Sequence, residues 1–196
     1  AAFESPNFCP GFLSGSACYL PRAALMVAMN GDFLVADLSQ LNEERYNHPE
    51  WKKPETIMIW GNNPIVSNAD GFYGHWIVDA MKMGSKLIVV DPRVTWLASK
   101  AEYHLQLRPG TDGALALGML NVIINEELYD KEFVDQWTFG FDQLKERVQE
   151  YPLEKVEKIT WVPKELIAEA ARYYAKSKPA AVQWGVAIDM ATDGVA

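Results

Sequence analysis

The sequence predicts an α/β fold: a Rossmann-like, open, mostly parallel sheet with helices on both faces, in three αβα layers. Residues 55–60 and 86–90 are short continuous apolar runs, which are typical of strands buried on both faces of a parallel sheet. Between them, residues 70–83 show helical spacing of apolar positions and end before Gly84, a favourable C-cap residue. Together these three segments predict a βαβ unit.

The following residues continue the alternation. The expected elements are a short helix at 95–100, a strand at 103–107, a helix at 112–125, one or two amphipathic helices within 126–158, a helix opened by Pro163 and ended by Lys178-Pro179, and a strand at 180–185. The helix at 112–125 is apolar nearly all round, so we expect it to pack between the sheet and another layer. The amphipathic helices are expected to be anchored by Phe133, Trp137, Phe141 and Leu144. After residue 185 no further element is expected.

The first 54 residues have a different character. Residues 1–17 are rich in turn formers, a helix is expected at 21–29, and residues 30–54 indicate a polar surface connection. We therefore predict two parts. Residues 1–54 would be a partial segment of a neighbouring domain, and residues 55–196 the Rossmann-like domain.

Composition excludes several classes of partner. The 196-residue chain has a net charge of −8, whereas nucleic-acid binding requires clustered Lys and Arg. No apolar run reaches the roughly 20 residues of a membrane span, and the sequence opens with no basic or apolar leader. The compartment, cytoplasm or periplasm of a prokaryote, stays open. Cys9 and Cys18 are nine residues apart, a spacing that matches no zinc or iron–sulfur signature.

Three unusual turns each follow a predicted strand. Ligands of open α/β sheets bind beyond the carboxyl ends of the strands, so the position of these turns predicts a binding site. One such turn is weak support for a site, but three at successive strand ends are specific. The turns are Trp60-Gly61-Asn62-Asn63-Pro64, Asp91-Pro92-Arg93-Val94-Thr95 and Arg108-Pro109-Gly110-Thr111-Asp112.

The first two turns carry side chains suited to a nucleotide. Gly61 has no Cβ, so a ligand can approach the backbone closely. Asn63 can both accept and donate hydrogen bonds. The Asp91 carboxylate can accept the two parallel N–H groups on the Watson–Crick edge of guanine, and the planar fork of Arg93 suits a phosphate.

The third turn precedes a helix. Gly110 and Thr111 lie where free amides and the helix dipole favour an anion or a polar edge. Asp112 has a purely structural alternative as the N-cap of that helix. The chain contains neither G-x-G-x-x-G after the first strand nor G-x-x-x-x-G-K-[ST], so neither a plain NAD site nor a P-loop is supported.

Cys18 is the notable residue upstream. It lies just before the helix expected at 21–29, where exposed amides and the helix dipole favour a thiolate. The alternative is that Cys18 is a small buried apolar residue. Of the histidines, His75 and His104 are given structural roles.

The three turns resemble the cofactor domain of the molybdopterin oxidoreductases, the dimethyl-sulfoxide-reductase superfamily, and the resemblance runs from about residue 5 to residue 190. This family includes formate dehydrogenases, nitrate reductases and thiosulfate reductases. The resemblance implies a molybdenum or tungsten ion held by two molybdopterin guanine dinucleotides (Mo-bis-MGD). The residues expected to contact one dinucleotide are Trp60, Gly61, Asn62, Asn63, Pro64, Ser67, Asp91, Pro92, Arg93, Thr95, Gly110, Thr111 and Asp112.

The upstream segment is similar to the family region that ligates the metal. Residues 5–7, Ser-Pro-Asn, are followed by Cys18-Tyr19-Leu20-Pro21, and Cys18 matches the position of the metal ligand and catalytic residue. Thiolate is a soft anionic ligand suited to such a metal. Cys9 has no matching role.

Family members are much longer than this chain. They usually begin with a domain whose four cysteines hold a [4Fe–4S] cluster and end with a β-rich domain that completes the second dinucleotide site. The resemblance therefore implies a C-terminally truncated internal fragment, catalytically incomplete alone. Its implied partners are the remainder of the catalytic subunit, an iron–sulfur electron-transfer subunit and a small-molecule substrate.

Three functions are compatible with these observations. The first is two-electron redox or oxo-transfer chemistry, as in anaerobic respiration, in which the cofactor does the chemistry and the protein positions and tunes it. The second is the non-redox chemistry of the hydratases and transhydroxylases of the same family. The third is a metal-free nucleotide-binding domain, in which Cys18 is buried and inert.

Overall fold

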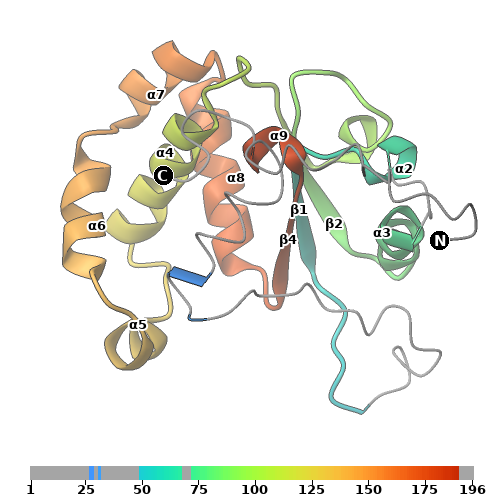
Figure 1. Ribbon diagram of the computed structural model, residues 1–196, viewed down its shortest axis with the longest axis horizontal. Helices are drawn as coiled ribbons and strands as arrows, with labels where there is room; N and C mark the ends of the chain where they lie inside the picture. The colour runs from blue at the N-terminus through green and yellow to red at the C-terminus, as the bar shows by residue number, and fades with distance from the viewer. Residues whose placement is uncertain (1–26, 29–30, 32–48, 68–71, 190–196) are drawn as a thin grey trace, which may run out of the picture.

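The computed structural model describes residues 27–28, 31, 49–67 and 72–189. Within these ranges a parallel β-sheet carries helices on both faces (Figure 1), which confirms the predicted three-layer α/β fold. Both cysteines, the expected loop at 1–17 and most of the helix expected at 21–29 lie outside the described residues. No described helix has the length and apolar character needed to cross a membrane.

The sheet holds four described strands in the order β3-β2-β1-β4, all parallel. They are β1 (Thr56–Trp60), β2 (Lys86–Val90), β3 (Tyr103–Leu105) and β4 (Ala180–Trp184). From β1 the chain proceeds outward through β2 to β3, and then returns to pair β4 with the other side of β1. The strand order therefore reverses between β1 and β4, which is where ligands bind in folds of this kind.

One face of the sheet is covered by α3 (Phe72–Lys82), which connects β1 to β2 after the short helix α2 (Pro64–Ser67). Ile57 and Ile59 of β1 pack with Ile77 of α3, and the 3₁₀ helix η3 (Ala98–Lys100) completes this smaller core. The C-cap predicted at Gly84 is confirmed by its positive φ of 99°. The helix α2 was not predicted, and the helix expected at 95–100 is a single 3₁₀ turn.

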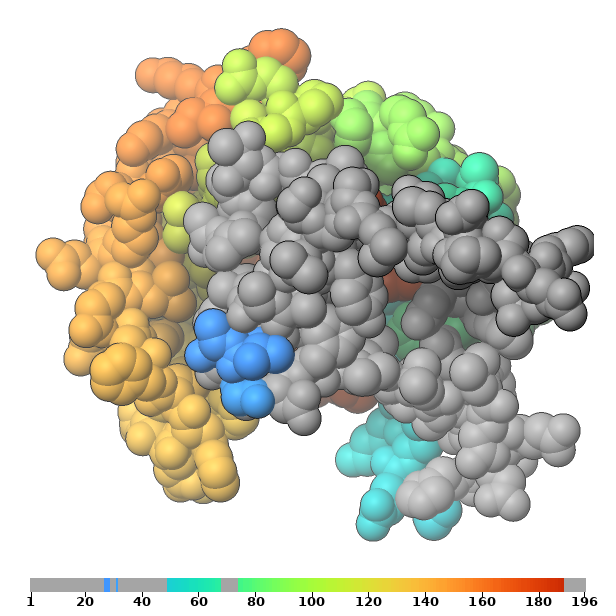
Figure 2. All heavy atoms as spheres, in the orientation of Figure 1, coloured from blue at the N-terminus to red at the C-terminus, as the bar shows by residue number. Residues whose placement is uncertain are grey.

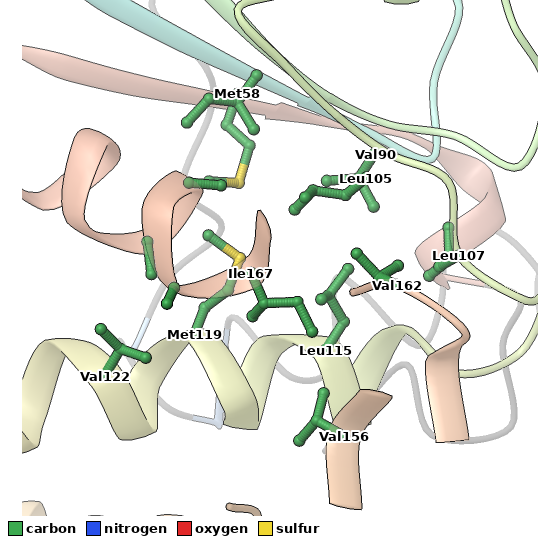
Figure 3. Close-up of a cluster of buried hydrophobic side chains, with 14 of the residues drawn as sticks. Met58, Val90, Leu105, Leu107, Leu115, Met119, Val122, Val156, Val162 and Ile167 are labelled. Carbon is green, nitrogen blue, oxygen red and sulfur yellow. The ribbon is translucent and has the colours of Figure 1, made fainter. Parts of the chain in front are cut away.

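The opposite face carries α4 (Asp112–Asn125) and α8 (Lys164–Lys176), and α6 (Phe141–Gln149) and α7 (Leu153–Thr160) pack behind α4. Figure 3 shows Met58 and Leu105 of the sheet together with Leu115 of α4 and Ile167 of α8 in one buried cluster. The prediction that α4 lies between the sheet and another layer is confirmed. Contact with α7 is close, because a Cβ on Gly118 would lie 2.9 Å from Val156.

Residues 126–158 form three helices, where one or two were predicted. The additional helix is α5 (Lys131–Trp137), on the outer surface with α6 (Figures 1 and 2). Phe133 and Trp137 are 57% and 76% exposed, so their assignment as core anchors was wrong. None of the residues of α5 is buried, so this helix has no apolar stripe facing the core. In α6 and α7 the buried apolar residues are Val148 and Val156.

Smaller differences occur at the ends of elements. The third strand ends at Leu105 and not at residue 107, because the chain turns where the Leu107 amide bonds to the Leu105 carbonyl at 3.1 Å. Pro163 is the residue before α8, in extended conformation, and not part of its first turn. A short helix, α9 (Val186–Asp189), follows β4 where no element was expected.

Candidate cofactor-binding site

The three predicted turns all follow strands at the carboxyl edge of the sheet, and the first of them lies beside the exit of β4. The first and second turns are adjacent because the Gly61 amide donates to the Val90 carbonyl at 3.2 Å. On the other side, the Gly185 amide after β4 donates to the Trp60 carbonyl at 3.0 Å. The main-chain ladder of the sheet thus continues by one bond into the turns on both sides of β1.

A side-chain hydrogen bond joins the first turn directly to the third. The Trp60 indole Nε1 donates to Asp112 Oδ1 at 2.8 Å, and the Trp60 ring is buried against the sheet core. The structural alternative for Asp112 was wrong by one residue, since Thr111 is the N-cap of α4 and Asp112 is its first helical residue. The Thr111 hydroxyl donates to the Arg108 carbonyl at 2.6 Å, which closes the third turn.

Two glycines allow the first turn to pack against α9. Gly61 has a φ of 61°, and a Cβ on it would lie 3.1 Å from Ile188 and 3.2 Å from Ala187. A Cβ on Gly185 would lie 2.6 Å from the Asn62 Cβ and 2.8 Å from the Gly61 carbonyl oxygen. The space beside Gly61 is therefore occupied by α9, a contact that the sequence did not indicate.

The remainder of the first turn begins α2. The Asn63 carbonyl accepts the amides of Val66 and Ser67, at 3.0 and 2.9 Å. It also accepts the Ser67 hydroxyl at 2.9 Å. Pro64 is the buried residue of this short helix. The Ser67 hydroxyl, predicted to contact the cofactor, is thus bonded to the turn itself.

The second turn presents the buried carboxylate of Asp91. Its Oδ1 accepts the Arg93 backbone amide at 2.8 Å, which closes a turn of the Asx type. The Arg93 guanidinium faces both oxygens, with Nε 3.3 Å from Oδ1 and Nη2 3.4 Å from Oδ2. Hydrogen bonding to Asp91 raises the pKa of Arg93. The Arg93 side chain is 70% exposed, so this guanidinium has room to move.

The main chain of the second turn is held by its neighbours. His104 Nε2 lies 2.8 Å from the Asp91 carbonyl oxygen, and Gln106 Nε2 donates to the Pro92 carbonyl at 2.8 Å. Thr95 has a structural role, because its hydroxyl oxygen accepts the amide of Ala98, the first residue of η3, at 3.1 Å.

The third turn is uncovered at Gly110 by the part of the chain that the structure describes. Gly110 has a φ of 79°, and no atom of the described residues lies within 4 Å of the position a Cβ would take. Arg108 is anchored by its amide, which donates to the Thr160 carbonyl at 2.8 Å, and its guanidinium lies 5.4 Å from the centre of the Trp161 ring. The third turn thus carries an exposed cation whose guanidinium lies over the Trp161 ring.

These groups fit a guanine nucleotide. Guanine offers N1–H and an N2 amino hydrogen side by side, and the two oxygens of Asp91 already face two parallel N–H donors of Arg93. The uncovered turn at Gly110 and the N-terminus of α4 suit a phosphate or another polar group. No cluster of three or more metal-ligating side chains occurs among the described residues, and Cys18, the predicted metal ligand, lies outside them.

Several residues of this edge were missed or undervalued by the sequence analysis. Gly185 was noted only as a glycine at a strand exit, and His104 was given a structural role without a partner. The alternation of apolar and polar residues in and just after strand β3 could have indicated on which face of the sheet His104 and Gln106 lie. Tyr103 and Leu105 face the larger core, so His104 and Gln106, the polar residues that alternate with them, belong to the other face.

Comparison with known proteins identifies the family. The family model of the molybdopterin oxidoreductases matches residues 14–196. The chain belongs to this family. Its relatives include acetylene hydratase of Syntrophotalea acetylenica, 58% identical over 111 residues, which cover 57% of this chain and 15% of the relative. Formate dehydrogenase H of Escherichia coli is 38% identical over 141 residues, which cover 72% and 19% of the two chains.

Two further matches cover most of this chain. The molybdopterin-containing subunit of thiosulfate reductase from Salmonella typhimurium is 32% identical over 181 residues, 92% of this chain and 22% of that subunit. The solved structure of acetylene hydratase from Pelobacter acetylenicus matches with a TM-score of 0.77 and 38% identity, covering 93% of this chain and 23% of that one. This molybdopterin oxidoreductase chain thus spans 15% to 23% of the length of these relatives.

Membership confirms the resemblance that the three turns predicted. The relatives are enzymes of the dimethyl-sulfoxide-reductase superfamily, and the family implies a molybdopterin cofactor with molybdenum or tungsten. The division of the chain at residue 54 and the individual ligand contacts stay predictions.

Proposed function

We propose that the carboxyl edge of this sheet binds the guanine dinucleotide portion of a Mo-bis-MGD cofactor. The observation that carries the proposal is the second turn, where a buried carboxylate at a strand end presents both oxygens to a pair of parallel N–H donors. This turn lies one strand from the place where the strand order reverses, and the first and third turns are bonded to each other beside it.

Guanine recognition would use Asp91 as a bidentate acceptor. One oxygen would accept N1–H and the other the N2 amino group, while the Arg93 guanidinium swings from Asp91 to a phosphate of the same ligand. Hydrogen bonds to a charged group contribute about 1.5–3 kcal/mol each. Adenine has an acceptor at N1 and no amino group at C2, so the same carboxylate would disfavour it.

The third turn would hold the charged part of the dinucleotide. The uncovered backbone at Gly110 permits close approach, and the helix dipole of α4 favours an anion at Thr111. Arg108 adds a positive charge in the same turn, where its guanidinium lies over the Trp161 ring. Asp112 keeps its carboxylate on Trp60, and so serves the site by joining two turns.

The metal would be ligated by Cys18, as a thiolate that supplies a soft anionic donor. The bound cofactor would supply two-electron redox or oxo-transfer chemistry on a small substrate. In the full-length enzyme we expect a [4Fe–4S] cluster and an iron–sulfur subunit to carry electrons to or from the site. These statements rest on the family.

Hydration is the second candidate reaction. It is favoured by the 58% identity to acetylene hydratase over 111 residues, against 38% to formate dehydrogenase H over 141 residues, although the solved acetylene hydratase is 38% identical over 93% of this chain. Addition of water to acetylene gives acetaldehyde without net electron transfer. Product formation from acetylene with no electron acceptor present would support hydration. Activity that requires an added acceptor or donor would support redox chemistry.

The cofactor proposal is tested by analysing the full-length enzyme that contains these residues, produced with the cofactor pathway present. Acid hydrolysis of the wild-type enzyme should release GMP in proportion to its molybdenum or tungsten. Asp91→Asn keeps an oxygen for the Arg93 amide but loses the second acceptor, so nucleotide content should fall about tenfold.

The matched control is Asp135→Asn on α5, an exposed position that loses the same charge and should leave the GMP content unchanged. Pterin and metal without nucleotide in the wild-type enzyme would contradict the proposal. So would an Asp91→Asn enzyme that retains as much GMP as the control.

A further inference from the structure

We propose that His104 and Gln106 form a clamp that aims the Asp91 carboxylate and so determines how well the site distinguishes guanine from related bases. This inference rests on the function proposed above, because it concerns the same turn. Both residues contact the turn through its main chain, and we assign them as positioning residues.

The clamp begins where the main-chain ladder between two strands stops. Strands β2 and β3 pair through Val90 and Leu105, after which β3 turns away. The next two carbonyls of the second turn, those of Asp91 and Pro92, are bonded instead by the side chains of His104 in β3 and of Gln106 just after it. Because Pro92 has no N–H, it cannot donate to a neighbouring strand, and the main-chain ladder cannot continue through it. A side-chain donor to its carbonyl is another means of fixing this part of the turn.

His104 and Gln106 suit this role by their spacing. They are two residues apart at the end of a strand, and so rise together on one face, about 7 Å apart along the chain. Their donors meet two consecutive carbonyl oxygens, each at 2.8 Å. A carbonyl oxygen only accepts, so His104 carries its proton on Nε2 in this contact.

Fixing these carbonyls fixes the carboxylate. The Asp91 carbonyl is held by His104, and Asp91 Oδ1 is held by the Arg93 amide at 2.8 Å. With the Pro92 carbonyl also bonded, the two carbonyls that follow the Asp91 Cα are restrained, and the Gly61 amide holds the Val90 carbonyl before it. A bidentate contact to a planar base requires both oxygens at once, so a small rotation of this turn would cost one of the two bonds.

The test measures base selectivity and not affinity alone. The probes are GDP and IDP, which differ only in the 2-amino group that the second Asp91 oxygen would accept. Isothermal titration of the wild-type chain should show GDP preferred over IDP. His104→Leu removes the donor, and the ratio of the GDP affinity to the IDP affinity should fall about fivefold. This factor corresponds to the loss of one hydrogen bond.

Three further variants test whether a loss of selectivity in His104→Leu is due to the clamp. His104→Gln places an amide donor near the position of Nε2, as Gln106 does beside it, and should retain the ratio. Gln106→Leu, at an exposed position that a folded chain tolerates, should lower the ratio, by less than His104→Leu. His75→Leu, an exposed histidine on α3, is the matched control and should leave the ratio unchanged.

The outcomes separate the clamp from the proposed function. A wild-type chain that binds GDP and ADP equally would contradict the proposed function itself. A chain that prefers GDP to ADP, but whose GDP-to-IDP ratio is the same in His104→Leu, Gln106→Leu and the control, overturns the clamp alone. Should His104→Leu fail to fold, as judged by thermal unfolding, Gln106→Leu against His75→Leu decides the question.

Discussion

The helical layer of α4 and α8 and the carboxyl edge of the sheet are held together by different interactions. In the helical layer, buried side chains such as Leu115 and Ile167 pack against the sheet with no exposed surface. At the carboxyl edge, the second turn is held by donors from His104, Gln106 and Arg93 to oxygens of Asp91 and Pro92.

This difference separates stability from binding. Apolar burial is non-directional and tolerates small shifts, but it dominates the free energy of folding. Hydrogen bonds to turn carbonyls contribute less to that free energy, yet they fix where a carboxylate points. Changes in the helical layer should therefore lower stability and leave ligand preference intact, whereas changes at the edge should weaken ligand binding or alter ligand preference at a smaller cost in stability.

The largest effect is expected in the helical layer. Ile167→Ala removes a fully buried side chain between α8 and the sheet, and should lower the free energy of unfolding by about 2–5 kcal/mol. Urea denaturation measures this value. At a temperature where the variant is folded, its preference for GDP over ADP should match that of the wild-type chain. A change in that preference would show that stability and ligand preference are not separable in this protein.

Gly185→Ala should affect the carboxyl edge most strongly. The new Cβ would lie 2.6 Å from the Asn62 Cβ, so the first turn has to move, at a cost of about 1–3 kcal/mol. We expect GDP affinity to fall at least about tenfold in titration. Gly84→Ala is the control, since it adds strain at a φ of 99° beyond the other end of the sheet and should leave GDP affinity unchanged. Equal losses in both variants would contradict this prediction.

The link between the first and third turns should have a smaller effect. Trp60→Phe keeps a buried ring but loses the hydrogen bond to the Asp112 carboxylate, for which we expect about 1.5 kcal/mol. A double-mutant cycle with Asp112→Ala isolates this bond from other effects of each change. A coupling free energy near zero in denaturant unfolding would show that the two turns are not linked energetically.

The smallest effect concerns a charged pair within the helical layer. Arg172 of α8 donates Nε and Nη2 to the Glu126 carboxylate, with Nη2 2.7 Å from Oε1, and this hydrogen bonding lowers the pKa of Glu126. A lowered pKa in the folded state stabilises the protein above the ordinary pKa of the group, and this stability is lost as pH falls through the lowered value.

Because the Glu126 side chain is 39% exposed, solvent screening limits the contribution to about 0.5 kcal/mol. Glu126→Gln should thus lower the free energy of unfolding slightly at pH 7, and the difference from wild type should disappear at acidic pH. A difference that stays constant with pH would show that the carboxylate charge is not involved.

The sequence predicted the fold and the core of the sheet well, because buried parallel strands and a nearly all-apolar helix leave strong patterns. The prediction that Phe133 and Trp137 anchor their helix was wrong, because a short surface helix can leave its aromatic residues exposed. The sequence identified the residues of the turns but did not indicate what holds them. The contacts of His104 with Asp91 and of Gly185 with Asn62 depend on how neighbouring strands diverge, which local spacing does not encode.

The central claim is that Asp91 selects guanine at this edge. Isothermal titration of GDP and ADP into the wild-type chain and into Asp91→Asn tests it most directly. We expect saturable GDP binding to the wild-type chain, ADP binding at least about tenfold weaker, and loss of this preference in Asp91→Asn. Equal affinities for GDP and ADP in the wild-type chain, or a preference that survives in Asp91→Asn, would contradict the account.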